Sequence, residues 1–305
     1  MKPLLLSLAI GLIAAATRLA APPSLPATSA APSSASSAVE LARWKDERLN
    51  ECSGLAASRR YRDLLWTHND SGDSARLFLV DGKGQTRATV ELDGAQAIDW
   101  EDMALSGRGH DVWLYAADIG DNLEARSEIA IYRIREPEIN LSSSAAPPTV
   151  QVKCERMILR YPDGAHNAET LAVAPDGRLL IVTKTLDRSA FYIVSKFQAG
   201  TTQTLSKIGE YAFGATTAHR RVRPRQTTGG DISPDGTRLV VMTYTQLYEW
   251  KLPRGNWKGF LKQTPRVEEL PALDQAESVC FAADGKHLLV SSEGLHAPLW
   301  ELSLP

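Results

Sequence analysis

The chain has 305 residues, of which 43% are hydrophobic and 23% charged, and its formal net charge is −2. This length allows one large domain or two average ones, and the composition is that of a globular protein. The near-neutral charge argues against a nucleic-acid or polyanion partner.

The N-terminus has the pattern of an export signal. A basic start is followed by an apolar run from Leu4 to about Ala16 and then by small residues. This predicts a secretory signal peptide over 1–21, with Ala16 or Ala21 as the last residue before cleavage. The run is shorter than the roughly 20 residues of a membrane span. We therefore expect an exported protein, periplasmic or extracellular, without a membrane span after cleavage; a retained anchor is the alternative.

Residues 22–38 contain mainly Ala, Pro and Ser and no charge. Such a segment cannot bury enough surface to fold, so we interpret it as a linker before a single folded domain at 39–305. Export would permit disulfides, but Cys52, Cys154 and Cys280 are odd in number and lie in unrelated settings. One bridge is possible; we expect free, mostly buried thiols.

A short sequence pattern recurs five times in this domain. The copies are "SGLAAS" (53–58), "EDMALS" (101–106), "ETLAVA" (169–174), "GDISPD" (230–235) and "ESVCFA" (277–282). Each copy precedes a tight turn and a second strand, and three of these turns contain Asp-Gly, a strong hairpin signal. A third strand follows in every unit and a fourth in most. The copies start 48, 68, 61 and 47 residues apart, and about 40 to 50 residues with four antiparallel strands is one propeller blade.

The pattern predicts an all-β fold, a β-propeller of five four-stranded antiparallel blades; a sixth, degenerate blade in the longer intervals is the alternative. The Pro-rich segment 135–149 is an expected insertion. The last unit stops one strand short, and "AVELARW" (38–44) can supply that strand and close the ring. A closed ring has no exposed sheet edges of the kind that promote aggregation, and we expect a monomer.

The predicted fold gathers polar loops at one end of the central channel. First strands line the channel, so loops that enter them share a face with loops that join second to third strands. We call this face the mouth. Its candidate metal ligands are Asn69, Asp70, Glu101, Asp118, Asp121, Glu169, Asp231 and Glu277. Its candidate substrate-binding residues are His68, His166, Lys184, Arg220, Arg221 and Glu293. In our alignment Glu101, Glu169 and Glu277 are equivalent, and Asp231 lies one position later.

Carboxylates gathered in a partly buried channel need protons, basic side chains or a bound cation. Oxygen ligands suit Ca²⁺, whereas the histidines leave Zn²⁺ or Mn²⁺ open. The alternative is structural: some of the Glu side chains hydrogen-bond the backbone of the next blade and hold the ring together. Arg220 and Arg221 belong to a basic loop that is either solvated or binds phosphate or carboxylate.

The motifs "LLWTHNDSGD", "AIDWEDMAL", "LYAADIGDN", "HNAETLAV", "TGGDISPDG" and "SSEG" resemble a family of uncharacterised secreted bacterial β-propellers, over roughly 45–305. The first strands are more distantly similar to phytase-like "esterase-like" propellers and to sugar-lactone hydrolase propellers. That resemblance implies divalent ions at the channel mouth, near Glu101, Glu169, Asp231 and Glu277.

Two functions fit these observations. The first is an exported propeller that binds a small or anionic ligand beside Ca²⁺ or another divalent cation. The alternative is a metal-dependent hydrolase of small anionic esters, phosphoesters or lactones, with Asp70, Glu101 or Asp118 as general base. The fold alone does not distinguish them.

Overall fold

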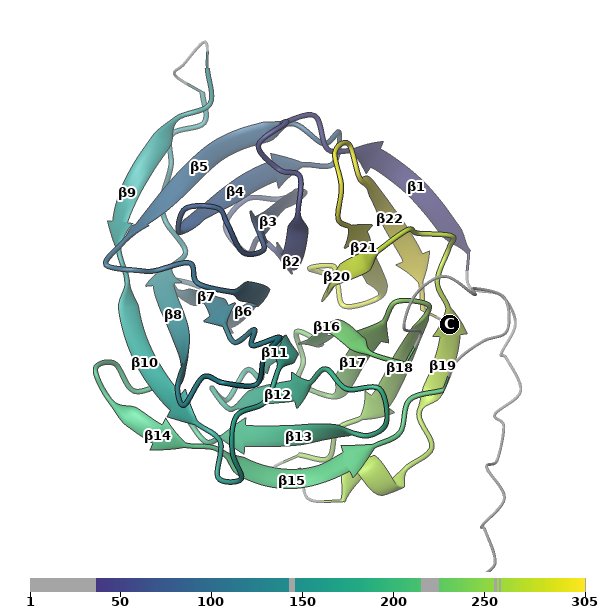
Figure 1. Cartoon of the computed structure of the whole chain (residues 1–305). Coiled ribbons are helices and arrows are strands. Elements are labelled where there is room, and N and C mark those ends of the chain that lie inside the picture. Colours follow the sequence, from purple (N-terminus) through teal and green to yellow (C-terminus); the bar gives the residue numbers. More distant parts are fainter. Residues whose placement is uncertain (1–36, 143–145, 215–224, 255–256, 258, 305) are drawn as a thin grey trace, which may run out of the picture. The chain divides into compact units, whose positions relative to one another are not determined.

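The strand repeats form five sheets arranged around a common centre (Figure 1). The computed structural model describes residues 37–142, 146–214, 225–254, 257 and 259–304. Within these ranges the one helical element is a 3-10 turn, η1 (Phe260–Lys262). No helix in the described ranges is long and apolar enough to cross a membrane. The five-bladed propeller is confirmed, and the described residues contain no sixth blade.

The first two blades each carry five strands. Blade 1 contains β2 (Cys52–Ala57), β3 (Leu64–Asn69), β4 (Arg76–Asp81), β5 (Thr86–Asp93) and β9 (Thr149–Lys153). Blade 2 contains β6 (Trp100–Arg108), β7 (Asp111–Asp118), β8 (Ile129–Arg135), β10 (Glu155–Arg160) and β14 (Thr202–Thr204). The first four strands of each blade pair antiparallel, as predicted.

The other three blades carry four strands each. Blade 3 contains β11 (Ala168–Val173), β12 (Leu179–Thr183), β13 (Ser189–Val194) and β15 (Ser206–Tyr211). Blade 4 contains β16 (Thr227–Ile232), β17 (Arg238–Thr243), β18 (Gln246–Lys251) and β19 (Arg266–Glu269). Blade 5 contains β20 (Ala276–Phe281), β21 (His287–Ser292), β22 (Pro298–Ser303) and β1 (Ala38–Arg43).

The ring closes in blade 5, where the first strand of the chain pairs antiparallel with the last. β1 is the outer strand of that blade, as the sequence predicted. Trp44, directly after β1, is buried and donates its indole N–H to Ser291 Oγ at 2.9 Å. Closure therefore combines a strand ladder with a buried side-chain anchor.

The fifth strands were not predicted. β9, at the end of the Pro-rich insertion, pairs parallel with the outer strand β5 of blade 1 before the chain returns to blade 2. β14 likewise leaves blade 3 and pairs parallel with β10 of blade 2. Both insertions thus cover the edge of the preceding blade and tie neighbouring blades together.

The hydrophobic core lies between the blades. Alternate residues of a strand point to opposite faces of its sheet. In β4, Leu77 and Leu79 pack toward blade 2, whereas Phe78 and Val80 pack toward blade 5. Each inner strand packs between the inner strands of two neighbouring blades and is buried over most of its length, which holds its ends in fixed positions around the channel.

All three cysteines are free, as expected: Cys52 and Cys280 are buried and Cys154 is partly buried. The Cys52 thiol lies 3.1 Å from Thr67 Oγ1 and 3.4 Å from Ser278 Oγ. These thiols are packing residues.

Candidate functional site

The same β-bulge recurs at the start of every inner strand. In each blade the pairing between the inner and second strands skips one residue. The skipped residues are Ser53, Glu101, Glu169, Thr228 and Glu277. A bulge leaves one residue out of the ladder and changes the direction of its side chain. Three of the five bulges therefore place a glutamate at equivalent positions on the channel wall, and each of these glutamates is buried.

Asp231 does not belong to this set, because the predicted alignment of the fourth repeat was wrong by two residues. Thr228 is the bulged residue of β16, and Asp231 lies three positions further along. Its carboxylate accepts hydrogen bonds from the backbone N–H of Ile232 at 2.7 Å and of Phe281 at 2.8 Å. Asp231 therefore links blade 4 to blade 5, and its role as a metal ligand stays a prediction.

Asp70, Asp99 and Glu101 form an acidic triad. Each contributes one carboxylate oxygen, and the three oxygens lie within 4.8 Å of one another. Asp70 follows the end of β3, and its backbone N–H donates to the carbonyl of Glu51 at 2.9 Å. Asp99 precedes β6, and its N–H donates to Asp118 Oδ1 at 3.2 Å. Loops of blades 1 and 2 thus hold the triad from two sides.

Negative charge in the triad is poorly compensated. The residue Glu101 is 3% exposed, and its carboxylate accepts no hydrogen bond from the described residues. Burial, reinforced by the charges of Glu169, Asp70 and Asp99, raises the pKa of Glu101 well above its usual value. Burial also raises the pKa of Asp70 to about 6 and raises the pKa of Asp99. Such a cluster requires protons or a cation.

The backbone at Gly120 lies directly against the triad, and we call this arrangement of backbone and acids the cradle. A Cβ added at this position would collide with Glu101 Oε1 and with the Asp99 carboxylate. The Gly120 N–H donates to the carbonyl of Asp99 at 3.1 Å, so the "DIGDN" loop is held against these acids. The donor set consists of oxygens alone, which fits a hard divalent cation such as Ca²⁺ better than Zn²⁺.

A second group of charges lies on blades 3, 4 and 5 around Lys184. Its ammonium pairs with Glu169 Oε1 and lies 5.2 Å from the ring centroid of Tyr244. Burial opposes its charge, but Glu169 and Glu277 together raise the pKa of Lys184. Burial raises the pKa of Glu169 to about 7, against the attraction of Lys184. Burial and the Glu169 charge raise the pKa of Glu277 well above its usual value. One ammonium thus serves two buried carboxylates.

Three more predicted ligands make contacts that shape the loops carrying the triad. Asp118 pairs with Arg126 at 2.8 Å. Asp121 accepts the backbone N–H groups of Ala125 and Arg126, at 3.0 and 2.7 Å, within its own loop. Asn69 accepts from the N–H of Glu51 at 3.2 Å and donates to the carbonyl of Arg48 at 2.6 Å and to an Asp73 oxygen at 2.8 Å. These contacts position the loops. Asp118 Oδ2 is buried without a hydrogen-bond partner among the described residues, and the role of all three residues as metal ligands stays a prediction.

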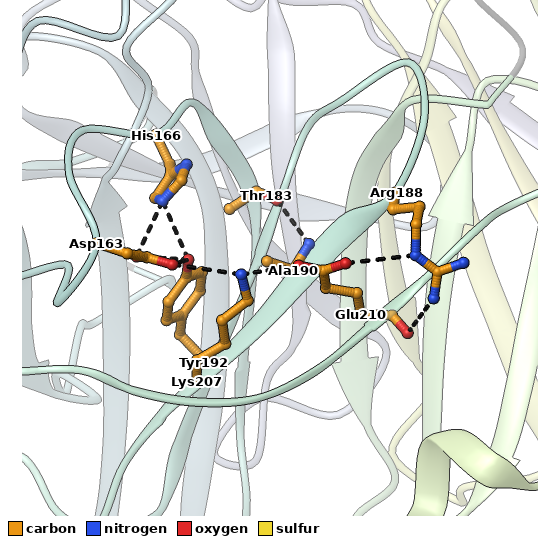
Figure 2. Close-up of polar contacts among 8 residues, drawn as sticks. All are labelled: Asp163, His166, Thr183, Arg188, Ala190, Tyr192, Lys207 and Glu210. Atoms are coloured by element: carbon orange, nitrogen blue, oxygen red, sulfur yellow. Dashed lines mark hydrogen bonds and ion pairs between the residues drawn. The ribbon is translucent and has the colours of Figure 1, made fainter.

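The two predicted histidines lie in different surroundings. His68 is fully buried, its Nδ1 lies 2.8 Å from the Asn69 carbonyl, and burial lowers its pKa. His166 belongs to a polar cluster of blade 3, shown in Figure 2 with Asp163, Tyr192 and Lys207. His166 Nε2 lies 3.0 Å from Asp163 Oδ1 and 3.0 Å from the Tyr192 hydroxyl. Neither imidazole is among the residues that form the triad.

The remaining predicted residues divide into two groups. Glu293 follows β21 at the mouth, and its Oε2 accepts from Gln275 Nε2 at 2.6 Å. Burial, followed by the charge of Glu277, raises the pKa of Glu293 to about 7. Arg220 and Arg221 lie outside the described residues, so their predicted role in anion binding stays a prediction.

The motif "AIDWEDMAL" contains three acids, Asp99, Glu101 and Asp102, of which the sequence analysis selected Glu101 alone. Asp99 joins the triad, and Asp102, next to Glu101, does not. Asp102 is fully buried and accepts the backbone N–H groups of Leu171 at 2.8 Å and of Gly230 at 3.2 Å. It links blade 2 to blades 3 and 4, so the backbone-bonding role expected for some glutamates belongs to two aspartates, Asp102 and Asp231. The bulge, for which the sequence has no signal, turns the Glu101 side chain toward the triad and leaves Asp102 in the strand ladder.

Comparisons with known proteins found a similarity to solved structures alone. Neither a scan of protein families nor a search of curated proteins found a match. Among solved structures, the chain is similar to a gluconolactonase from Xanthomonas campestris, with 13% identity and a TM-score of 0.44 over 89% of this chain and 87% of that one. At this identity and TM-score the likeness says nothing of the chemistry at the mouth.

Proposed function

We propose that the mouth of this propeller binds a divalent cation at Asp70, Asp99 and Glu101, and that the cation and Lys184 together hold a small anionic ligand. The observation that carries the proposal is the buried Glu101 carboxylate, which has two acidic neighbours and no hydrogen-bond donor among the described residues. Leaving such a group ionised and uncompensated is costly, and a cation removes that cost.

The donor chemistry favours Ca²⁺, which takes six to eight oxygen ligands. Three carboxylates supply only part of such a shell, so water or ligand oxygens would complete it. An anion at an otherwise acidic mouth needs positive charge. The cation would supply it, and Lys184, which already pairs with Glu169, would add to it.

The first test is metal content and thermal stability of the purified protein, with and without chelator. We expect a bound divalent ion whose removal lowers the melting temperature and whose return restores it. The Asp99→Asn and Glu101→Gln variants should lose this response, whereas Glu47→Gln, an exposed acid away from the triad, should keep it. No bound metal and no response to added Ca²⁺ would contradict the proposal.

The second candidate function is hydrolysis of a phosphoester or lactone. It is favoured by a carboxyl group outside the triad: burial raises the pKa of Glu169 to about 7. A base works best with a pKa near the working pH. A bound divalent cation would supply polarisation of the ester and a more acidic water. A screen of phosphoesters and lactones, repeated with Glu101→Gln, tests this function. Cation-dependent ligand binding without turnover would contradict hydrolysis and support binding as the function.

Export is part of the proposal and rests on the signal-peptide pattern of residues 1–21. N-terminal sequencing of protein recovered outside the cytoplasm should find a start after Ala16 or Ala21. Recovery of the uncleaved chain in the cytoplasmic fraction alone would contradict it.

A further inference from the structure

The opposite end of the channel contains a cavity of about 450 Å³. It lies at the turns that join first to second strands, on the face away from the triad. All five blades contribute to its wall: Arg59, Arg108, Val173, Ile232 and Ala283 represent blades 1 to 5 in order. Its volume is within the range of roughly 300–1,000 Å³ that is usual for small-molecule sites.

The wall combines apolar side chains with two arginines. Leu105, Val173 and Ile232 line it together with two prolines. Neither Arg59 nor Arg108 forms an ion pair with any carboxylate of the described residues. The Arg59 guanidinium makes one long contact, 3.5 Å to the carbonyl of Ala283.

Three acids near this cavity are already engaged. Asp231, whose carboxylate also interacts electrostatically with Arg59, accepts the backbone N–H groups of Ile232 and Phe281. Asp235, the one acidic residue of its described lining, accepts from the Ser233 hydroxyl at 2.6 Å and from Thr237 N–H at 3.0 Å. Glu136 accepts from the backbone N–H of Arg59 at 3.3 Å and from the Ser58 hydroxyl at 2.5 Å. The two guanidinium groups therefore retain their capacity to bind an outside anion.

We propose that this cavity is a second ligand site, independent of the mouth, for a small organic anion with an apolar body. The guanidinium groups of Arg59 and Arg108 would bind the anionic group, because planar guanidinium matches carboxylate and phosphate oxygens. The apolar wall of the channel would take the rest of the molecule. The site requires no metal, which separates it from the proposed function of the mouth.

Calorimetric titration with benzoate, benzamide and phenyl phosphate, in excess chelator, tests the site. We expect benzoate or phenyl phosphate to bind at least about tenfold more tightly than neutral benzamide, since charge-assisted hydrogen bonds are lost with the charge. The stronger of the two anions identifies the carboxylate or the phosphate as the preferred group.

Arg59→Gln should lower the affinity roughly tenfold, and Arg108→Ala several-fold, because Arg108 is more exposed. Arg62→Ala is the matched control, an exposed arginine of the same face outside the cavity. Melting temperatures of all variants show whether they are folded. Absence of saturable binding by either anion, or equal affinity in Arg59→Gln and Arg62→Ala, would overturn the proposal.

Discussion

Glu101 is a buried acid whose carboxylate has other acids as neighbours and no described hydrogen-bond donor. Its neighbour Asp102 is buried just as deeply, yet accepts three backbone N–H groups, those of Met103, Leu171 and Gly230. Adjacent acids of one strand thus have opposite environments. Asp102 links the inner strands of three blades. The charge of Glu101 would be compensated only by a cation or another positively charged group that reaches the triad.

The change Glu101→Gln should therefore stabilise the metal-free protein. An amide removes the buried charge, and we expect the free energy of unfolding in chelator to rise by about 1–3 kcal/mol at pH 8. Urea denaturation of both proteins in chelator measures this. A loss of stability in chelator would mean that the Glu101 carboxylate has a protein partner that satisfies it.

A substitution at Gly120 tests whether the cradle is rigid without removing an acid. In Gly120→Ala the added Cβ meets the carboxylates of Glu101 and Asp99, so we expect a loss of about 1–3 kcal/mol of stability and weaker cation binding. Gly82→Ala is the control, because a Cβ there meets nothing within 4 Å and the backbone is not left-handed. Thermal melts with and without Ca²⁺ provide both measurements. Equal behaviour of the two variants would show that the loop yields and that the cradle is not rigid.

At the scale of the element, the inner strand with its bulge is the unit that builds the site. The period of the repeats predicted five blades and their strand order, because apolar alternation and Asp-Gly turns are local signals. The bulge is a property of strand pairing and has no such signal. The sequence alignment therefore matched Gly-Asp at 230–231 with Glu-Asp at 101–102. In the structure the residue equivalent to Glu101 is Thr228, which occupies the bulge. The parallel strands β9 and β14 escaped prediction for a related reason: they are short, and their pairing is determined by the neighbouring blade.

Asp231 gives the inner strands a pH dependence. Burial raises its pKa from an ordinary 3.8 to about 7, so the folded protein holds this proton more tightly than the unfolded chain. The stability from this group is fully present below about pH 4 and is lost as the pH rises toward 7. In Asp231→Asn that loss should disappear, making the free energy of unfolding flatter between pH 4 and 7 by a few kcal/mol at most.

Denaturation curves across this pH range, with Asp187→Asn as an exposed control, measure the difference. Identical slopes in wild type and Asp231→Asn would mean that the carboxylate is ionised in the fold and stabilised by its two backbone N–H donors.

At the scale of the whole ring, every inner strand touches the inner strands of both neighbouring blades, so the position of each mouth residue depends on closure. The triad draws on blades 1 and 2, and the Lys184 group on blades 3, 4 and 5. Opening the ring at any blade would therefore separate groups that act together. Blade 5 is the natural place to test this, because its outer strand comes from the other end of the chain.

A chain that starts at Trp44 lacks β1, whereas one that starts at Ser37 keeps it. The shorter chain keeps the Trp44 indole bonded to Ser291 but exposes the edge of β22, which pairs with β1 in the intact protein. We expect a loss of several kcal/mol of unfolding free energy and self-association that grows with concentration, since an unpaired edge recruits another strand. Denaturation and light scattering on the two chains measure these effects. If the shorter chain were equally stable and monomeric, the interblade packing alone would hold the ring, and the mouth should then bind its cation as tightly without β1 as with it.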